Sequence, residues 1–331
     1  MSVTGDIAAA STPPWIHYST LPVRRLLRLS PDQASFQTRG FTGASPSSQS
    51  ALEMIGQTFI DGYNTAILSN DVRDVLQYVS CIPSTERGFA VEGVVMGTAV
   101  ADALPFRKSL LPACIESFEA DFTYLAHVGA GWSLARVPWR RRRILAELAP
   151  LHHWLAFDGL GFHDTYFYHR RIFGGWRRER SGYVARAYDQ GVGRALWFVA
   201  GGSVVAAVEL LSALPESRHS DIWSGLGLAM TYAGLAAAGD IAGACEAAGP
   251  HRAQFAQGVA FACEARFLAR HVPAHTDLAA KTVTGIGADE LSALVRAARG
   301  NLPADTADAP AYEIWRHRVA SAISPMVAGR S

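Results

Sequence analysis

A short block containing glycine recurs along this 331-residue chain, and it constrains the fold more than any other sequence feature. Most blocks combine an aromatic residue and a polar residue with glycine, an aliphatic residue, and then glycine or alanine. The blocks centre on Gly62, Gly93, Gly131, Gly159, Gly191, Gly225 and Gly258. Their mean spacing is about 33 residues, a period typical of helix-pair repeats. The repeat therefore predicts an array of stacked helix pairs.

Apolar residues after position 50 recur at spacings of three and four, the period of amphipathic helices. This spacing is clear in ALEMIGQTFIDGYNTAI and in SLLPACIESFEADFTYLAHV. Abundant alanine lowers the cost of helix formation, and alternating strand-like segments are scarce. We predict an all-α domain of helix-pair repeats over residues 51–325, which forms a compact bundle, a solenoid or a toroid.

Residues 1–50 are less regular and contain STPP near their start and GASPSSQS at their end. We expect an irregular N-terminal arm, with a short strand-like or helical piece around Leu26–Leu29, followed by a polar linker.

The repeated glycines could lie in loops between helices or within the helices themselves. Apolar residues continue through most blocks without other helix-breaking residues, which favours positions within helices. A glycine inside a helix costs about 1 kcal/mol relative to alanine. We therefore expect these glycines to permit the close approach of a neighbouring backbone or of a ligand.

Composition narrows the classes of function. The chain is 49% hydrophobic, enough for a sizeable core, and its formal net charge is +1. That balance argues against non-specific nucleic-acid binding, which needs a strong positive field. We expect neither a transmembrane helix nor a secretory signal, because no long apolar run and no basic N-terminal start occur. The 4 cysteines have no close pairing and suggest buried free thiols in the cytoplasm.

Polar side chains adjoin the glycines of most blocks, and they are the best candidates for chemistry. They include Glu92, Asp158, Asp189 and Gln190, with Arg194 one turn further on. A buried carboxylate is costly unless it is paired, so acids beside small residues on apolar helices are candidate site residues. Asp158 lies within an apolar run, which favours a site. Asp189 and also Asp221 could equally cap helices or complement their dipoles.

Histidines concentrate in one part of the chain, namely at His127, His152, His153, His163 and His169. If residues 150–171 form one helix, no two of its histidines have the i, i+4 spacing that would let them share a metal ion. The dipeptide His163-Asp164 resembles that of the all-helical phosphohydrolases named for an adjacent His and Asp, which implies a metal site. The alternative is that these histidines are hydrogen-bonded core or surface residues.

Arginines cluster at residues 140–143 and again at residues 170–180. They are either solvated helix ends or a docking surface for an acidic partner, such as an acyl carrier protein. The docking candidates are Arg140, Arg141, Arg142 and Arg143. The sequence contains no GxSxG, no phosphate-binding P-loop and no kinase-type motif set.

Several blocks together resemble an uncharacterised bacterial family, a domain of unknown function from actinobacterial and related genomes. These blocks are RGFAVEGVVMG, AFDGLGFHDTYF, YDQGVGRALWFV, DIWSGLGLAMTYAG and AQGVAFACEAR. The resemblance spans about residues 20–320. Because members are often encoded in or near gene clusters for enediyne-type polyketides, it implies an accessory role in that specialised metabolism. It transfers no catalytic residues.

Our leading hypothesis is an enzyme that cyclises, isomerises or dehydrates a hydrophobic polyene intermediate. Aromatic side chains would hold the apolar chain while polar groups move protons. The candidate catalytic residues are Glu92, Asp158, His163, Asp164, Asp189 and Arg194. The alternative is a non-catalytic helical-repeat protein that holds an intermediate or docks a carrier protein. The sequence specifies neither a metal nor a cofactor.

Overall fold

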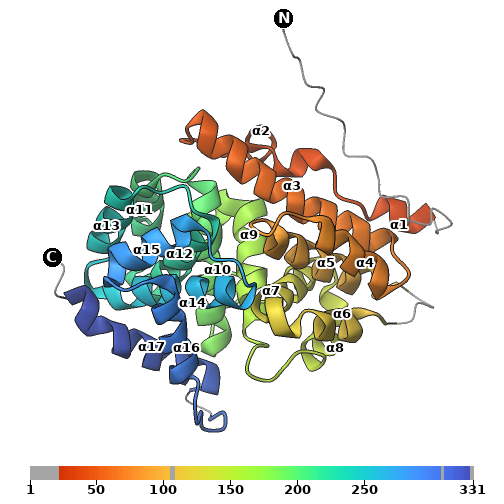
Figure 1. Cartoon of the computed structure of the whole chain (residues 1–331). Helices are drawn as coiled ribbons and strands as arrows, with labels where there is room; N and C mark the ends of the chain where they lie inside the picture. Colours follow the sequence, from red (N-terminus) through yellow and green to blue (C-terminus); the bar gives the residue numbers. More distant parts are fainter. Residues whose placement is uncertain (1–21, 105–108, 307–308, 329–331) are drawn as a thin grey trace, which may run out of the picture.

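A computed structural model describes residues 22–104, 109–306 and 309–328 of the chain (Figure 1). Every regular element within these residues is a helix, which confirms the all-α prediction. Residues 1–21, the first part of the predicted arm, lie outside the described residues.

Long inner helices alternate with shorter outer helices along most of the chain. The inner helices are α3 (Pro46–Leu68), α5 (Arg87–Ala101), α7 (Glu119–Arg136), α9 (Leu155–Phe173), α10 (Gly182–Val199), α12 (His219–Ala233) and α14 (Arg252–Leu268). The outer helices are α4 (Val72–Cys81), α6 (Leu111–Ser117), α8 (Arg141–Ala146), α11 (Val204–Ser212), α13 (Ala238–Ala247) and α15 (Ala274–Thr284). This alternation is the predicted helix-pair repeat. It is interrupted once, because the described residues 174–181 between α9 and α10 contain no helix.

The remaining elements lie at the two ends of the array and in its connections. Two short helices, α1 (Pro22–Leu26) and α2 (Phe36–Arg39), precede α3, and α16 (Ala288–Ala298) and α17 (Ala311–Ala328) follow α15. Short 3-10 helices are η1 (Pro31–Ala34), η2 (Pro138–Arg140), η3 (Glu216–Arg218) and η4 (Gly249–His251).

The array of inner helices curls back on itself. Figure 1 shows the first half of the chain on one side and the second half on the other, with α9 and α10 between them. The rings of Phe89 on α5 and Tyr232 on α12 lie 5.3 Å apart. Arg266 of α14 donates a hydrogen bond to the carbonyl of Thr85, just before α5, at 2.7 Å. Contacts this far apart in sequence distinguish a closed, compact array from an open solenoid.

Each inner helix carries one glycine block, and the glycines lie where inner helices touch. A Cβ on Gly191 of α10 would overlap the carbonyl oxygen of Asp158 on α9. Reciprocally, a Cβ on Gly161 of α9 would overlap the carbonyl oxygen of Tyr188 on α10. Backbones can approach this closely only where no side chain intervenes. The prediction that the glycines lie within helices and admit a neighbouring backbone is therefore confirmed.

Two helices begin at positions that differ from the predicted ones. α3 begins at Pro46, because Ser45 caps it by accepting a hydrogen bond from the backbone N–H of Ser48 at 3.1 Å. The segment predicted as a polar linker thus contains a helix start, for which serine and proline are favoured residues. α9 begins at Leu155, because the chain forms turns over residues 150–154.

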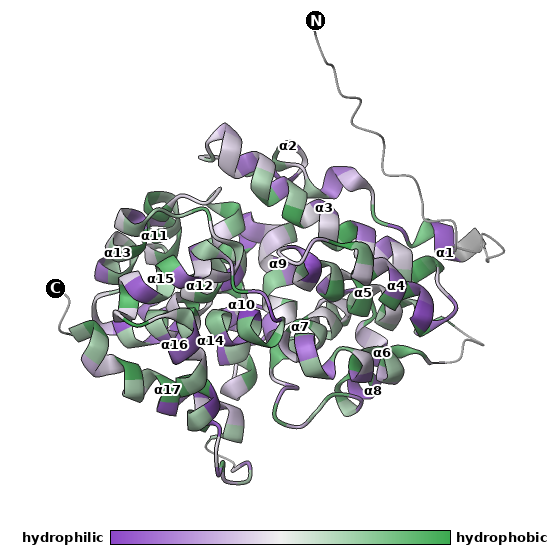
Figure 2. Cartoon of the chain, viewed as in Figure 1, coloured by the Kyte–Doolittle hydropathy of each residue, from purple (hydrophilic) through white to green (hydrophobic). Residues whose placement is uncertain are grey.

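Hydrophobic and hydrophilic residues share the same helices throughout the described structure (Figure 2). None of the described helices combines the length and the apolar character needed to cross a membrane. The cysteines are free, and Cys114 and Cys263 are buried as predicted, whereas Cys245 is half-buried and Cys81 is exposed.

Candidate active site

The curled array surrounds a partly enclosed cavity to which all the inner helices contribute. Its walls are mostly apolar and aromatic, and include Phe59, Phe89, Trp132, Phe162, Phe198 and Phe261. The cavity volume is about 90 Å³, within about 1090 Å³ of atom-free space that includes the open mouth. A single water needs about 10–15 Å³ on the narrower measure, so the cavity has room for a slender ligand. Such walls suit an apolar molecule.

Three of the predicted site residues meet on the wall of this cavity. Arg194 of α10 donates one hydrogen bond to Asp158 Oδ1 of α9 at 2.6 Å and another to Glu92 Oε1 of α5 at 2.9 Å. All three side chains are buried, and the guanidinium lies 5.2 Å from the centre of the Phe162 ring. We call Glu92, Asp158 and Arg194 the cavity cluster.

Helix geometry explains why these residues converge. Glu92, Asp158 and Gln190 each stand directly before the first glycine of their block, and each lines the cavity. The glycine side of a helix packs against its neighbour, and the residue before it points to the inside of the curled array. Residues four apart share a helix face, so Arg194 lies beside Gln190 on α10 and Phe162 lies beside Asp158 on α9. In three of the blocks, the position directly before the first glycine thus supplies a polar group to the cavity wall.

The cavity cluster has fewer positive than negative groups. Burial raises the pKa of Glu92 and of Asp158, and the shared Arg194 guanidinium only partly opposes this effect. With both carboxyls ionised, the cluster would carry a net negative charge in an apolar cavity, which is costly. The cluster therefore retains a proton to higher pH than ordinary carboxyls do.

Several polar atoms on the cavity wall have no hydrogen-bond partner among the described residues. They include Asp158 Oδ2 and the hydroxyls of Tyr124 and Tyr232. Gln190 lies close enough to lower the pKa of Asp158, although no hydrogen bond of ordinary geometry reaches Oδ2. Buried polar atoms are normally satisfied by protein, water or ligand. These atoms are therefore candidate hydrogen-bond partners for a bound molecule.

His163 and Asp164, which were also predicted as site residues, do not line the cavity. Asp164 accepts hydrogen bonds from Arg178 at 2.7 and 3.0 Å and from the Tyr188 hydroxyl at 2.9 Å. His163 Nδ1 lies 3.2 Å from Asp164 Oδ1. Although burial opposes it, hydrogen bonding from His163 and Arg178 lowers the pKa of Asp164. Within the described part of the chain, no third metal-ligating side chain joins this pair.

Asp189 also lies away from the cavity, where two arginines saturate it. Arg218 donates two hydrogen bonds to its Oδ1, at 3.1 and 2.8 Å, and Arg177 donates one to its Oδ2 at 2.6 Å. Asp221 has similar partners, Arg186 and Arg316. The alternative helix-cap role does not apply to Asp189, which lies in the middle of α10.

Sequence reasoning predicted aromatic walls but did not identify the aromatic residues that form them. Tyr124, Val128 and Trp132 lie four residues apart on α7 and line the cavity together. Tyr232 on α12 also lines the cavity. Counting in steps of four from the residue before each glycine would have found the α7 stripe, because Val128 directly precedes Gly129.

Three of the four predicted docking arginines are engaged within the chain. Arg140 donates a hydrogen bond to the carbonyl oxygen of Ala103 at 3.4 Å. Arg141 pairs with Glu179 at 2.6 Å, and Arg143 pairs with Glu147 at 3.3 Å.

Comparison with known families identifies a match over most of the chain. The model for the family described as protein of unknown function (DUF1702) matches residues 21–323, so the chain belongs to this family. No curated protein and no solved structure matches it. All the inner helices, and hence the cavity cluster, lie inside the matched region.

Proposed function

We propose that this DUF1702 protein is an enzyme that isomerises or cyclises an apolar polyene by proton transfer in the central cavity. The observation that carries the proposal is the buried, unpartnered Oδ2 of Asp158 on an aromatic wall. A carboxyl whose pKa is raised by burial suits general acid catalysis near neutral pH.

The proposed step begins with protonated Asp158 giving its proton to one carbon of a double bond. The π electron pair forms the new C–H bond and leaves a cation on the adjacent carbon. For isomerisation, the Asp158 carboxylate then takes a proton from a neighbouring carbon, and that C–H pair forms the new double bond. For cyclisation, a second double bond of the substrate attacks the cation before the proton is lost. Neither route needs an oxidant or a reductant.

The remaining wall residues have defined tasks in this scheme. Arg194 holds Asp158 and Glu92 in place and balances the carboxylate formed after proton donation. The faces of Phe162 and Trp132 stabilise a carbocation through their ring quadrupoles. The apolar walls exclude water, which would otherwise capture the cation.

The family resemblance suggests that the polyene comes from enediyne or related polyketide biosynthesis. Such a chain could arrive on an acidic carrier protein, which basic side chains would attract. A surface pocket containing Arg39, Arg170 and Arg171 shares Phe167 with the central cavity. This surface is better placed for docking than Arg140–Arg143.

The test is deletion of the gene in a producing strain, with metabolite profiling and complementation. Wild-type protein should restore the product, and Asp158→Asn should reduce its formation by about 100-fold or more, as for loss of a general acid. Asp289→Asn, which changes an exposed acid on α16, is the matched control and should behave as wild type. Product formation by Asp158→Asn at the wild-type rate would refute the proposal.

The second candidate is a non-catalytic protein that binds and protects the same molecule. The unpartnered hydroxyls of Tyr124 and Tyr232 favour it, because they could hold a polar end of a ligand without any chemistry. Incubation in D₂O distinguishes the two functions. The enzyme introduces deuterium into the recovered molecule, whereas the binding protein returns it unchanged.

A further inference from the structure

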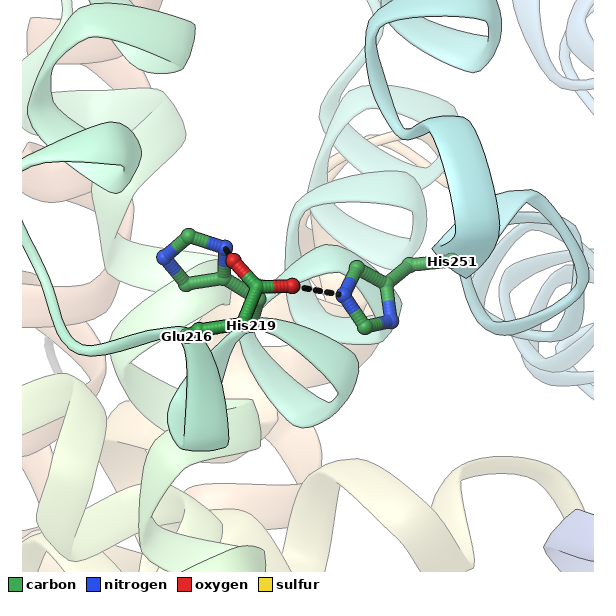
Figure 3. A group of neighbouring side chains, drawn as sticks. All are labelled: Glu216, His219 and His251. Atoms are coloured by element: carbon green, nitrogen blue, oxygen red, sulfur yellow. Dashed lines mark hydrogen bonds and ion pairs between the residues drawn. The ribbon is translucent and has the colours of Figure 1, made fainter.

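A glutamate and two histidines cluster away from the cavity, where α12 and α14 begin (Figure 3). Glu216 opens η3, His219 is the first residue of α12, and His251 ends η4 directly before α14. Figure 3 shows the Glu216 carboxylate between the two imidazole rings. Its Oε2 lies 2.9 Å from His219 Nδ1 and its Oε1 lies 3.1 Å from His251 Nε2.

The spacing of these donor atoms matches what a small cation requires. One potential ligand atom from each residue lies within 4.8 Å of the other two. Donors bound tetrahedrally to zinc at about 2.0–2.1 Å lie about 3.3 Å from one another. Only small side-chain adjustments are therefore needed to place all three on one ion. The Glu216 side chain is 74% exposed, so solvent reaches the cluster.

The hydrogen bonding of His219 is a second and independent indication. Its Nε2 lies 2.8 Å from the carbonyl oxygen of Leu214, which can only accept, so Nε2 carries a proton. In the neutral ring the lone pair is then on Nδ1 and faces Glu216 Oε2, which is also an acceptor. A cation between the two atoms would be bound by both of them, whereas without a cation a ring protonated at both nitrogens would form an ion pair with the carboxylate. A ligating histidine whose other nitrogen donates to a backbone carbonyl is the usual arrangement in metal sites.

We propose that Glu216, His219 and His251 bind one divalent transition-metal ion, and that Zn²⁺ is the best fit to this donor set. A tetrahedral ion would keep a position open for water. The positive ends of α12 and α14 lie close by and oppose a cation, so the charge of Glu216 is essential. Arg218 anchors η3 to Asp189 at 2.8 Å, so the ion would fasten the start of α14 to a fixed point on α12.

The test uses the full chain without a polyhistidine tag and Zn²⁺ alone as the probe. Equilibrium dialysis against a competing chelator should give one Zn²⁺ per chain with micromolar or tighter affinity. Glu216→Gln and His251→Ala should each weaken binding by at least about tenfold. His317→Ala removes an exposed histidine of α17 and is the matched control, which should bind as wild type.

Two further measurements report directly on the site. Co²⁺ should give the visible absorption of a tetrahedral site in the wild type and lose it in Glu216→Gln, which preserves the shape of the side chain. Zn²⁺ should raise the thermal unfolding midpoint of the wild type and of His317→Ala but not that of the site variants. Wild-type affinity no tighter than millimolar, or equal affinity in Glu216→Gln and the wild type, would overturn the proposal.

Discussion

Two neighbouring inner helices carry a buried aspartate in nearly the same place and use it differently. Asp158 of α9 stands directly before the first glycine of its block, whereas Asp189 of α10 stands one residue earlier, with Gln190 in the equivalent position. One residue turns a helix by about 100°. Asp158 and Gln190 therefore face the cavity, and Asp189 faces Arg177 and Arg218 instead.

This single step of register separates the proposed catalytic acid, Asp158, from a structural one, Asp189. Asp189 accepts hydrogen bonds from two guanidiniums, so each of its oxygens already has a partner. Asp158 shares one guanidinium with Glu92 and keeps Oδ2 unpartnered. Burial and residue type are the same in both cases. The number of partners, set by the direction of the side chain, makes the difference.

The largest effect should come from disturbing the contact that fixes this register. Gly191→Ala would place a Cβ against the carbonyl oxygen of Asp158. This oxygen belongs to the backbone of α9, which cannot move aside without a large cost in energy. We expect a loss of about 4 kcal/mol or more, or failure to fold. Gly243→Ala in the outer helix α13 meets open space and should be neutral or stabilise by up to about 1 kcal/mol. Denaturant unfolding measures both, and equal effects would disprove the role assigned to the inner glycines.

The next largest effect should come from the structural aspartate. Asp189→Asn leaves the buried Arg218 without its carboxylate and should destabilise the fold by about 3–5 kcal/mol. Asp158→Asn removes one negative charge from a cluster that has a single positive group, and Arg194 keeps Glu92 as a partner. We therefore expect the free energy of unfolding to fall by about 1 kcal/mol or less. The comparison requires only the free energies of unfolding of the two variants. A larger loss for Asp158→Asn would reverse the assignment of roles.

The pH dependence of stability should have opposite signs at two acids of the same helix. Burial raises the pKa of Asp158, so the native state holds its proton longer than the unfolded state, and stability falls as pH rises above about 4. Hydrogen bonds lower the pKa of Asp164 despite burial, so its contribution is present above about pH 4 and is lost as pH falls through the folded-state value.

Asparagine variants should therefore diverge from the wild type in opposite directions. With rising pH, Asp158→Asn should gain stability relative to the wild type, because it mimics the protonated acid. Asp164→Asn should lose stability relative to the wild type as pH rises from the folded-state pKa of Asp164 to about 4, and the difference should stay constant above that pH. Urea unfolding between about pH 2 and pH 8 checks both trends, the Asp164 trend below about pH 4 and the Asp158 trend above it. A difference between the Asp164→Asn variant and the wild type that changes only above about pH 4 would contradict the assigned protonation.

Much of this architecture follows from local sequence rules. The glycine period predicts the helix-pair array, and the residue before the glycine identifies Glu92 and Asp158 as inward-facing acids. Arg194 follows from its position four residues after Gln190. These inferences succeed because helix periodicity is local and the packing glycines fix the phase of each inner helix.

Other features depend on how the array closes, which no local pattern specifies. His163 is not one of these features, because it lies five residues after Asp158, about 140° around α9, and helix periodicity alone turns it away from the cavity. Glu216 and His251 are 35 residues apart and meet only because α12 and α14 are neighbours. The start of α3 is a different kind of error, because Ser45 and Pro46 are helix-start residues that were interpreted as linker.

The smallest expected effect tests whether a residue lines the cavity simply because it stands directly before the first glycine of its block. Ser224 of α12 and Gln257 of α14 occupy the position of Asp158 in their blocks, but neither lines the cavity. They satisfy each other through a 2.8 Å hydrogen bond from Ser224 to Gln257 Oε1. Ser224→Ala should therefore cost about 1 kcal/mol of stability and leave ligand binding unchanged.

Gln190→Ala provides the matched comparison, because it removes a polar group at the same repeat position on the cavity wall. Binding of a fluorescent polyene should change in Gln190→Ala and not in Ser224→Ala. If both variants bind the polyene as the wild type does, the wall position of Gln190 is irrelevant to the ligand. If Ser224→Ala alone alters binding, access to the ligand lies between α12 and α14. Either result would show that the repeat determines how the helices pack but does not by itself determine which residues contact the ligand.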